Sequence, residues 1–269
     1  MKKVKLVLWI LIAIMLIWLI GLTGYNMYSA KTEEVVHPEI SFEIENHGTI
    51  KMKLYPEYAP NTVANIIKLA EKGYYNNNVI YGKDDVCLYV GRDSEGLAEV
   101  PKASLINDAI EDDSDSDYEY TIPGEFLVNG YEENTLRHEK GVVSLMRSDY
   151  TQYFSNLVNE SYNSGSAQIG IMMKNTPSLN GAYTAFAKIT EGLDILEKIY
   201  NEEAIQEPEV SEDGETTESA IDVFATYPVI KSATVNTFGN DYGMPVIMKA
   251  FDYDAYMNEF LTTYYSGQQ

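Results

Sequence analysis

Two alternating apolar runs separated by a short turn constrain the fold of this chain more than any other feature. Every second residue is apolar from Ile40 to Ile44 and again from Ile50 to Leu54, and the residues between the runs include Asn46, His47 and Gly48. Successive side chains of a strand point to opposite faces of a sheet. The pattern therefore predicts an antiparallel hairpin with one buried face.

A helical pattern follows the hairpin. Pro60 suits the first turn of a helix, and Gly73 suits the position just after its end. Between them, apolar residues recur three or four positions apart and define one helix face: Val63, Ile66, Ile67 and Ala70. Further strand-like runs lie at residues 141–147, 167–174, 183–189 and 228–236, and a second amphipathic helix places Leu193, Leu196 and Ile199 on one side. Short strands with two helices predict a mainly β fold, a closed antiparallel barrel capped by helices.

The amino-terminal segment predicts a membrane anchor. Residues 6–22 hold no charge, and as a helix they would reach ~26 Å. Lysines precede this run, so the positive-inside rule predicts a single-pass protein of the cell membrane, with its amino terminus inside and the following domain outside the cytoplasm. A cleaved signal peptide is the alternative, although the run is longer than a typical signal and the cleavage site is poor.

The acidic composition argues against nucleic acid as a partner. Acidic residues number 41 against 19 basic ones, which leaves no basic stripe for nucleic acid. Two acidic segments read as insertions, near 107–119 and near 201–222, and the second is expected to be mobile. Counted from Asp113, the first lacks the glycine and glutamate of a calcium loop of the hand type. Residues 239–269 form an aromatic and acidic extension in which one side of a short helix is expected from Phe251, Met257, Phe260, Leu261 and Tyr264.

Cysteine and histidine give little chemistry of their own. Cys87 is the only cysteine, so no intramolecular disulfide can form, and it reads as a small buried residue. His47 is expected in a turn and His138 on the surface, and the scattered histidines predict no metal site. No nucleophile constellation or phosphate loop is visible, and no cofactor is expected.

Over roughly residues 40–235 the chain resembles the cyclophilin family of peptidyl-prolyl cis-trans isomerases. The resemblance lies in five motifs that follow the family's order: IKMKLYPEYAPNTVANIIKLAEKGYY, YTIPGEF, RHEKGVVSLMRS, NSGSAQIGIMM and PSLNGAYTAFAKITEGLDILEKI. The family fold is an eight-stranded antiparallel barrel with a helix over each end. The resemblance thus implies this barrel over residues 39–238, preceded by the anchor (1–28) and a linker (29–38).

The family's site residues are only partly retained. Aligned without gaps, the family's catalytic arginine falls on Gly82, directly after Tyr81. The family's Phe-Met pair and following Gln fall on Cys87, Leu88 and Val90. In the Ser-Gln-Phe-Phe motif the glutamine remains as Gln168, and both rings are lost. By this resemblance the peptide groove comprises Tyr81, Cys87, Leu88, Val90, Met146, Gln168, Ile169, Leu179, Tyr183 and Phe186.

Three cations are candidates for replacing the missing donor. Lys83 follows Gly82, but neighbours on a strand face opposite sides unless a bulge intervenes. Arg92 and Arg147 offer a planar guanidinium that lysine lacks. The alternative for both arginines is an ion pair with one of the many carboxylates at the surface.

Two hypotheses of function follow. The first is a membrane-anchored, extracytoplasmic isomerase that assists the folding of exported proteins, with weak activity because the arginine position is Gly82. The second is a catalytically inactive module whose altered groove binds a prolyl-containing peptide or a protein partner. Fold alone does not decide between them.

Overall fold

The computed structural model describes residues 14–19, 21, 35–202, 204–210 and 216–266, with the backbone alone for 206–210 and 216–220. The chain divides into two units, Met1–Val36 and His37–Gln269. In the first unit, residues 14–19 and 21 are helical. The second unit contains all of the elements named below.

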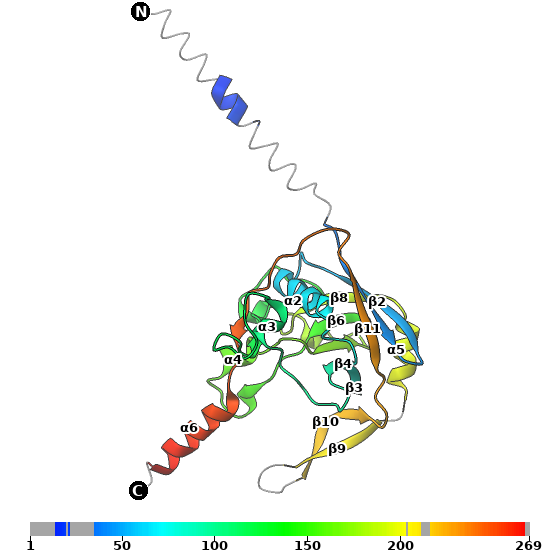
Figure 1. Cartoon of the computed structure of the whole chain (residues 1–269), viewed down its shortest axis with the longest axis vertical. Coiled ribbons are helices and arrows are strands. Elements are labelled where there is room, and N and C mark those ends of the chain that lie inside the picture. Colours follow the sequence, from blue (N-terminus) through cyan, green and yellow to red (C-terminus); the bar gives the residue numbers. More distant parts are fainter. Residues whose placement is uncertain (1–13, 20, 22–34, 203, 211–215, 267–269) are drawn as a thin grey trace, which may run out of the picture. The chain divides into compact units, whose positions relative to one another are not determined.

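The strands and helices of the second unit follow each other along the chain (Figure 1). The strands are β1 (Glu39–Ile44), β2 (Gly48–Leu54), β3 (Val79–Lys83), β4 (Cys87–Arg92), β5 (Tyr120–Thr121), β6 (Val142–Leu145), β7 (Ile169–Met172), β8 (Ala185–Glu191), β9 (Ala204–Val210), β10 (Thr216–Phe224), β11 (Ile230–Asn236) and β12 (Met248–Lys249). The α-helices are α2 (Pro60–Glu71), α3 (Ala103–Ile106), α4 (Val158–Tyr162), α5 (Leu193–Tyr200) and α6 (Tyr253–Ser266). Three short 3-10 helices are η1 (Leu127–Asn129), η2 (Tyr150–Gln152) and η3 (Pro177–Leu179).

The predicted hairpin and helix are confirmed. Strands β1 and β2 pair antiparallel, with Phe42 opposite Ile50, and the alternating apolar side chains of both strands are buried. Helix α2 begins at Pro60, and the face predicted from its spacing is buried in the core. The strand-like runs also correspond to strands, which are β6, β7, β8 and β11.

A buried carboxylate organises the start of α2. The residue before the helix, Ala59, offers no side-chain cap, and Glu125 takes this role from a distant loop. Its two oxygens accept hydrogen bonds from the backbone N–H groups of Asn61 and Thr62 and from the Thr62 hydroxyl, at 2.6–2.9 Å. Burial raises the pKa of Glu125, against the effect of these hydrogen bonds. The loop of the YTIPGEF motif is thereby fixed to the helix.

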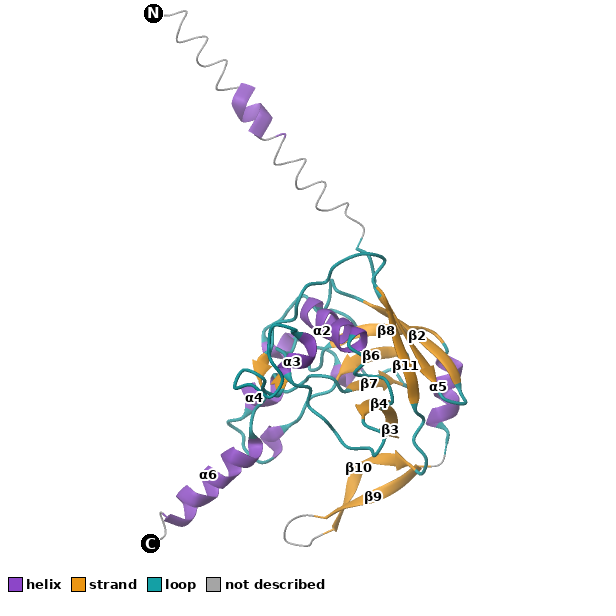
Figure 2. Cartoon of the chain, viewed as in Figure 1, coloured by secondary structure: helices purple, strands orange, loops and turns teal. Residues whose placement is uncertain are grey.

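The prediction of a closed eight-stranded barrel is wrong. The structure has an open sheet of ten strands in the order β11-β1-β2-β8-β6-β7-β4-β3-β10-β9, and a separate pair of β12 and β5. The acidic segment near 201–222 supplies much of the difference, because β9 and β10 form an antiparallel ribbon that pairs with β3 (Figure 2). Since β10 occupies that edge of β3, only an isolated bridge between Val79 and Val229 joins β3 to the segment before β11.

The predictions of a transmembrane helix and of a single-pass protein in the cell membrane are also overturned. No helix within the described residues has both the length and the apolar content to cross a membrane. Most of the segment that suggested the anchor, residues 6–22, lies outside the described residues.

Helix α6 confirms that the carboxy-terminal extension forms a helix. None of its side chains is buried, and its amino-terminal part meets the region of η2 through aromatic rings. The ring of Tyr253 stacks on Tyr150 with centroids 5.2 Å apart, and Phe260 meets Phe154 edge-on at 5.1 Å. Aromatic pairs of this kind stabilise a contact beyond the area that they bury.

Candidate functional site

Two bulges rebuild the strand pair on which the family carries its catalytic arginine. In the pairing of β3 with β4, Ile80 lies opposite Val90 and Gly82 lies opposite Tyr89, so Tyr81 is an extra residue on β3. Gly91 is likewise extra on β4, with a φ of +110° that favours glycine. Bulges of this kind redirect side chains at a sheet.

The bulged strands open onto a pocket of about 310 Å³. It lies where β3, β4 and β10 approach the segments at 146–148 and 164–168. Five residues singled out from the sequence lie on its wall: Tyr81, Arg92, Met146, Arg147 and Gln168. The remaining lining residues are Glu99, Val100, Ser148, Ser164, Ser166, Ala167 and Ile221.

The scaffold holds one wall of this pocket from behind. Asn65 of α2 donates through its side chain to the carbonyl oxygen of Ser166 at 2.7 Å. The Tyr75 hydroxyl donates to the carbonyl oxygen of Ala167 at 2.9 Å. Both groups are buried, where an unpaired polar atom is costly. The segment leading into Gln168 is therefore fixed by α2, which the sequence predicts from its periodicity, and by the turn that follows it.

Tyr81 links the two sides of the pocket. Its hydroxyl donates to the side-chain oxygen of Gln168 at 3.0 Å, and its ring stacks on Tyr89. The Arg92 guanidinium lies over the same ring, 3.9 Å from its centroid. Burial raises the pKa of Tyr81, which keeps the hydroxyl protonated as a donor. The retained glutamine is thus held by a tyrosine of this chain.

The position of the family's arginine is closed by β10. Gly82 pairs with Val223, and a Cβ atom built on Gly82 would lie 2.7 Å from both the backbone oxygen of Asp222 and a methyl carbon of Ile221. Real Cβ atoms do not approach a backbone oxygen this closely. No larger side chain therefore fits at this position while β10 is in place.

Lys83 points to a different part of the molecule. Its ammonium donates to the carbonyl oxygens of Tyr200 and Glu202, both at 2.8 Å, at the end of α5. It also lies 5.6 Å from the centroids of the Tyr200 and Phe224 rings. Cations stabilise the carboxyl end of a helix. Lys83 does not line the pocket.

Several predicted groove residues lie in the hydrophobic core. The inward-facing set is at most 1% exposed and comprises Leu88, Val90, Ile169 and Phe186. Cys87 is 3% exposed and belongs to a second apolar cluster with Met172. Leu179 packs against that cluster, and Tyr183 contacts Arg147. The structure therefore brings only part of the predicted groove together at the pocket.

Sulfur atoms fill the space over Gly170, where the family motif has its second ring. A Cβ atom built there would lie 2.9 Å from the Met146 sulfur and 3.7 Å from the Cys87 sulfur. The Cys87 thiol contacts the Met172 sulfur at 3.6 Å. Burial raises the pKa of Cys87 to about 12, so the thiol is neutral and behaves as a packing group.

The sequence yielded predictions for two histidines, and the structure agrees with one of them. His47 lies in the hairpin turn, as predicted, and contacts the Glu202 carboxylate at 2.8 Å. The prediction that His138 lies on the surface is wrong, since this side chain is 2% exposed. One of its ring nitrogens is 3.1 Å from the Ser144 hydroxyl, and burial lowers the pKa of His138.

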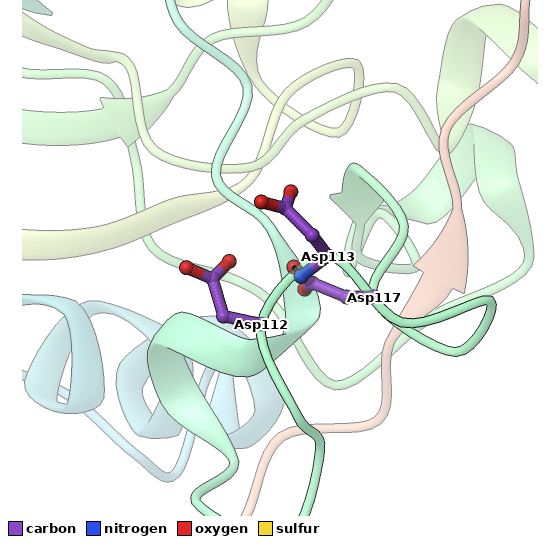
Figure 3. Close-up of side chains that lie close together, drawn as sticks. All are labelled: Asp112, Asp113 and Asp117. Atoms are coloured by element: carbon purple, nitrogen blue, oxygen red, sulfur yellow. Dashed lines mark hydrogen bonds between the residues drawn. The ribbon is translucent and has the colours of Figure 1, made fainter.

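Three aspartates lie close together in the acidic loop that follows α3 (Figure 3). None of them lines the pocket. Asp112, Asp113 and Asp117 each bring a carboxylate oxygen within 4.8 Å of the others. The ammonium of Lys102 lies 2.5 Å from Asp113 and 3.8 Å from Asp117. Although burial acts to raise it, hydrogen bonds from Ser104 and Asp113 lower the pKa of Asp117 to about 2. A lysine and backbone N–H groups thus account for this cluster as an ordered turn.

Seven lining residues were not singled out from the sequence, and three of them illustrate why. Ile221 arrives on β10, and the alternation of Ile221 with Val223 inside an acidic segment was the signal that could have revealed this strand. Glu99 and Ser166 come from loops, for which the sequence carries no periodic signal. Loop residues of this kind are placed by tertiary contacts alone.

Comparison with known proteins places the chain in a family. Residues 39–221 match the family model of the cyclophilin-type peptidyl-prolyl cis-trans isomerases. The chain therefore belongs to the cyclophilin family.

The relatives that it resembles are distant in sequence. Peptidyl-prolyl cis-trans isomerase B of Bacillus subtilis is 28% identical over 169 residues, which cover 63% of this chain and 95% of that protein. Peptidyl-prolyl cis-trans isomerase-like 2 of Rhizopus delemar is 25% identical over 189 residues, or 66% of this chain and 30% of that protein. The match thus spans less than a third of the fungal protein's length.

A solved structure supports the fold. The crystal structure of a Cryptosporidium parvum cyclophilin-type peptidyl-prolyl cis-trans isomerase matches with a TM-score of 0.50 at 17% identity, covering 76% of this chain and 99% of the other. At this identity the likeness concerns the fold, and function must be argued from the site.

Proposed function

We propose that this protein binds prolyl-containing peptide segments at the pocket beside Tyr81 and Gln168, and that it isomerises them slowly. One observation supports the proposal: the family's arginine is absent from its usual position, while two arginines from other positions line the pocket. The family's arginine position is Gly82, closed by β10, while Arg92 and Arg147 line the pocket.

The expected slowness has a physical reason. Rotation about a peptide bond has a barrier of about 18–20 kcal/mol because nitrogen conjugates with the carbonyl. In the family, an arginine donates a hydrogen bond to the prolyl nitrogen as this conjugation is lost. Removing one donor that is aimed at a transition state costs roughly 10²–10³ in rate. The two arginines of the pocket come from β4 and from the segment after β6. Neither therefore approaches the peptide from the position that a donor on β3 would have.

A second candidate function is supported by the space over Gly170. Met146, Cys87 and Met172 occupy the region in which the family carries an aromatic ring. A groove without that ring presents less apolar surface to a proline. We propose as the alternative that the protein binds a peptide or protein partner without turnover.

Exchange spectroscopy by NMR tests both candidates with the whole chain and a neutral alanyl-prolyl peptide. The Bacillus subtilis relative, measured beside it, is the reference. We expect peptide resonances to shift on binding and cis-trans exchange to be accelerated roughly a hundredfold less than by the reference. Shifts without acceleration favour the binding module. Acceleration equal to the reference contradicts the slow enzyme, and an unchanged spectrum contradicts peptide binding altogether.

Substitutions can then locate the donor. Arg92→Gln and Arg147→Gln each remove one guanidinium from the pocket. Arg137→Gln is the matched control, because Arg137 is the third of the chain's three arginines, is exposed, and does not line the pocket. Residual acceleration that survives both pocket substitutions would contradict an arginine donor.

A further inference from the structure

Among the described residues, neither arginine of the pocket forms an ion pair with a carboxylate, although the chain has 41 acidic residues. Within the described part of the chain, every ion pair is made by a lysine or a histidine. The alternative that Arg92 and Arg147 bind surface carboxylates is therefore not what the structure shows. Each guanidinium donates one hydrogen bond to a backbone carbonyl oxygen, Arg92 to Gly96 at 3.2 Å and Arg147 to Ser148 at 3.5 Å, but neither charge is balanced by a described carboxylate.

The nearest acidic residues along the chain have other partners. Asp93 follows Arg92, and its carboxylate accepts from the backbone N–H groups of Glu95 and Leu97 at 2.8–2.9 Å. Asp149 follows Arg147 by two residues, and its carboxylate accepts from the backbone N–H and the hydroxyl of Thr151. These hydrogen bonds lower the pKa of Asp149, with a smaller contribution from Arg147. Both carboxylates thus stabilise turns and leave the neighbouring guanidinium groups available.

Aromatic rings position the two guanidinium groups. Arg92 lies on the Tyr81 ring at 3.9 Å, and Arg147 lies 4.5 Å from the centroid of the Tyr183 ring. The Nε atoms of Arg92 and Arg147 are buried and have no hydrogen-bond partner among the described residues. Buried donors without an acceptor are uncommon in proteins, and each is explained by strain, by a functional role, or by a bound water or ion. A ring-stacked guanidinium keeps the planar fork that binds a carboxylate through two hydrogen bonds.

The rest of the wall is compatible with an anion. Ser148, Ser164 and Ser166 supply hydroxyl groups, and Gln168 supplies a side-chain amide. Glu99 is the acidic residue among those lining the pocket, and it is exposed. The lining therefore carries two cations and one solvated carboxylate, in a chain whose formal net charge is −22.

We infer that the pocket recognises an acidic side chain that lies next to the proline of the bound peptide. The inference rests on the proposed function, because it names the class of peptide that the same pocket takes. One guanidinium binds the peptide carboxylate, and the prolyl ring lies against the apolar part of the wall formed by Tyr81, Met146 and Ile221. The preference is local, since the rest of the molecular surface repels acidic peptides.

Fluorescence anisotropy with the whole chain tests this inference. The probes are labelled five-residue peptides with a central proline that carry Glu or Gln directly before or directly after the proline. We expect a Glu peptide to bind about tenfold more tightly than its Gln counterpart on at least one side of the proline, as for a charge-assisted hydrogen bond. The advantage should shrink as salt is raised, because screening weakens exposed ion pairs.

Variants distinguish a binding role from a structural one. Arg147→Gln or Arg92→Gln should remove most of the advantage of Glu, measured within each variant as the ratio of the Glu-peptide affinity to the Gln-peptide affinity. Arg147→Lys should keep part of the advantage, because charge remains and the fork is lost. Arg137→Gln should change neither affinity. A ratio that stays unchanged in both pocket variants would instead indicate that the arginines have a structural role, and it would overturn the inference.

The remaining outcomes separate the inference from the proposed function. Equal binding of Glu and Gln peptides overturns the acidic preference and leaves prolyl binding in place. No binding of any peptide overturns both. A phosphoserine-proline peptide that binds more than tenfold more tightly than the Glu peptide overturns the choice of a carboxylate and identifies phosphate as the anion.

Discussion

The two positions at which the family pattern loses a large side chain, Gly82 and Gly170, are closed in different ways. At Gly82 the obstacle is backbone, since the carbonyl oxygen of Asp222 on β10 lies 2.7 Å from where a Cβ would be. At Gly170 the obstacle is the end of a flexible side chain, since the Met146 sulfur lies 2.9 Å away. A backbone oxygen in a strand pair cannot yield without breaking the pair, whereas a methionine changes rotamer at little cost. The first closure belongs to the fold, and the second belongs to side-chain packing.

Substitution of Gly82 should have the largest effect. Gly82→Ala and Gly82→Arg both add a Cβ that collides with β10, so we expect each to lower the free energy of unfolding by about 3 kcal/mol. Urea denaturation followed by circular dichroism measures this. The arginine variant should also isomerise prolyl peptides no faster than the native protein does, although it restores the family's residue type at this position. A stable Gly82→Arg protein with faster exchange would show that β10 moves away from this edge and would remove the contrast with Gly170.

Lys83 tests how firmly the same edge is held. Lys83→Met removes two hydrogen bonds from an ammonium to the carbonyl oxygens of Tyr200 and Glu202. A single hydrogen bond to a charged group contributes about 1.5–3 kcal/mol. Because the Lys83 ammonium is only partly buried and water replaces part of the loss, we expect a total loss of about 2 kcal/mol in the free energy of unfolding. Lys231→Met is the matched control, because this half-exposed lysine forms an ion pair with a single described residue, Glu45, at 3.4 Å. Its loss should stay below about 1 kcal/mol, and equal losses in both variants would refute a special role for Lys83.

The scaffold was predictable from the sequence because its information is periodic. Alternation at Ile40 to Leu54 and helical spacing at Val63 to Ala70 depend only on which face is buried. The prediction of a closed barrel was wrong: it followed from the pattern of short strands with two helices and from the family resemblance, and neither shows that β10 occupies the edge of β3. Strand β10 was missed because its segment is acidic and only Ile221 and Val223 show alternation.

The site was less predictable than the scaffold for a physical reason. A bulge shifts every later side chain to the other face of the sheet, and nothing in a single sequence shows where bulges at Tyr81 and Gly91 fall. The identity of Gly82 as a poor catalytic position was readable from the alignment. Its closure by β10 depends on tertiary contacts between residues that lie far apart in sequence.

Gly170→Ala tests the softer closure. The added methyl group meets only the Met146 sulfur at close range, while the Cys87 and Met172 side chains lie at 3.7 Å, an ordinary contact. We therefore expect a loss below about 1 kcal/mol in the free energy of unfolding, against the larger loss for Gly82→Ala. Combining Gly170→Ala with Met146→Ala should remove the collision. The double variant should therefore lose less unfolding free energy than the sum of the losses of the two single variants. A loss as large as that at Gly82 would contradict the distinction between the two sites.

The smallest perturbation leaves the sequence unchanged and uses Cys87 as a reporter beneath Met146. Burial raises the pKa of this thiol from 9.0 to about 12, and only the thiolate reacts with iodoacetamide. Below the raised pKa, the thiolate fraction grows about tenfold per pH unit. We therefore expect the alkylation rate to rise without levelling between pH 8 and pH 10.5, with circular dichroism confirming that the fold persists. For an exposed thiol, the alkylation rate would level off above pH 9.

The variant Met146→Ala extends this measurement. Its alkylation rate at pH 8 should rise severalfold, because opening the space over Gly170 hydrates the thiol. An unchanged rate would mean that Met146 does not close this space.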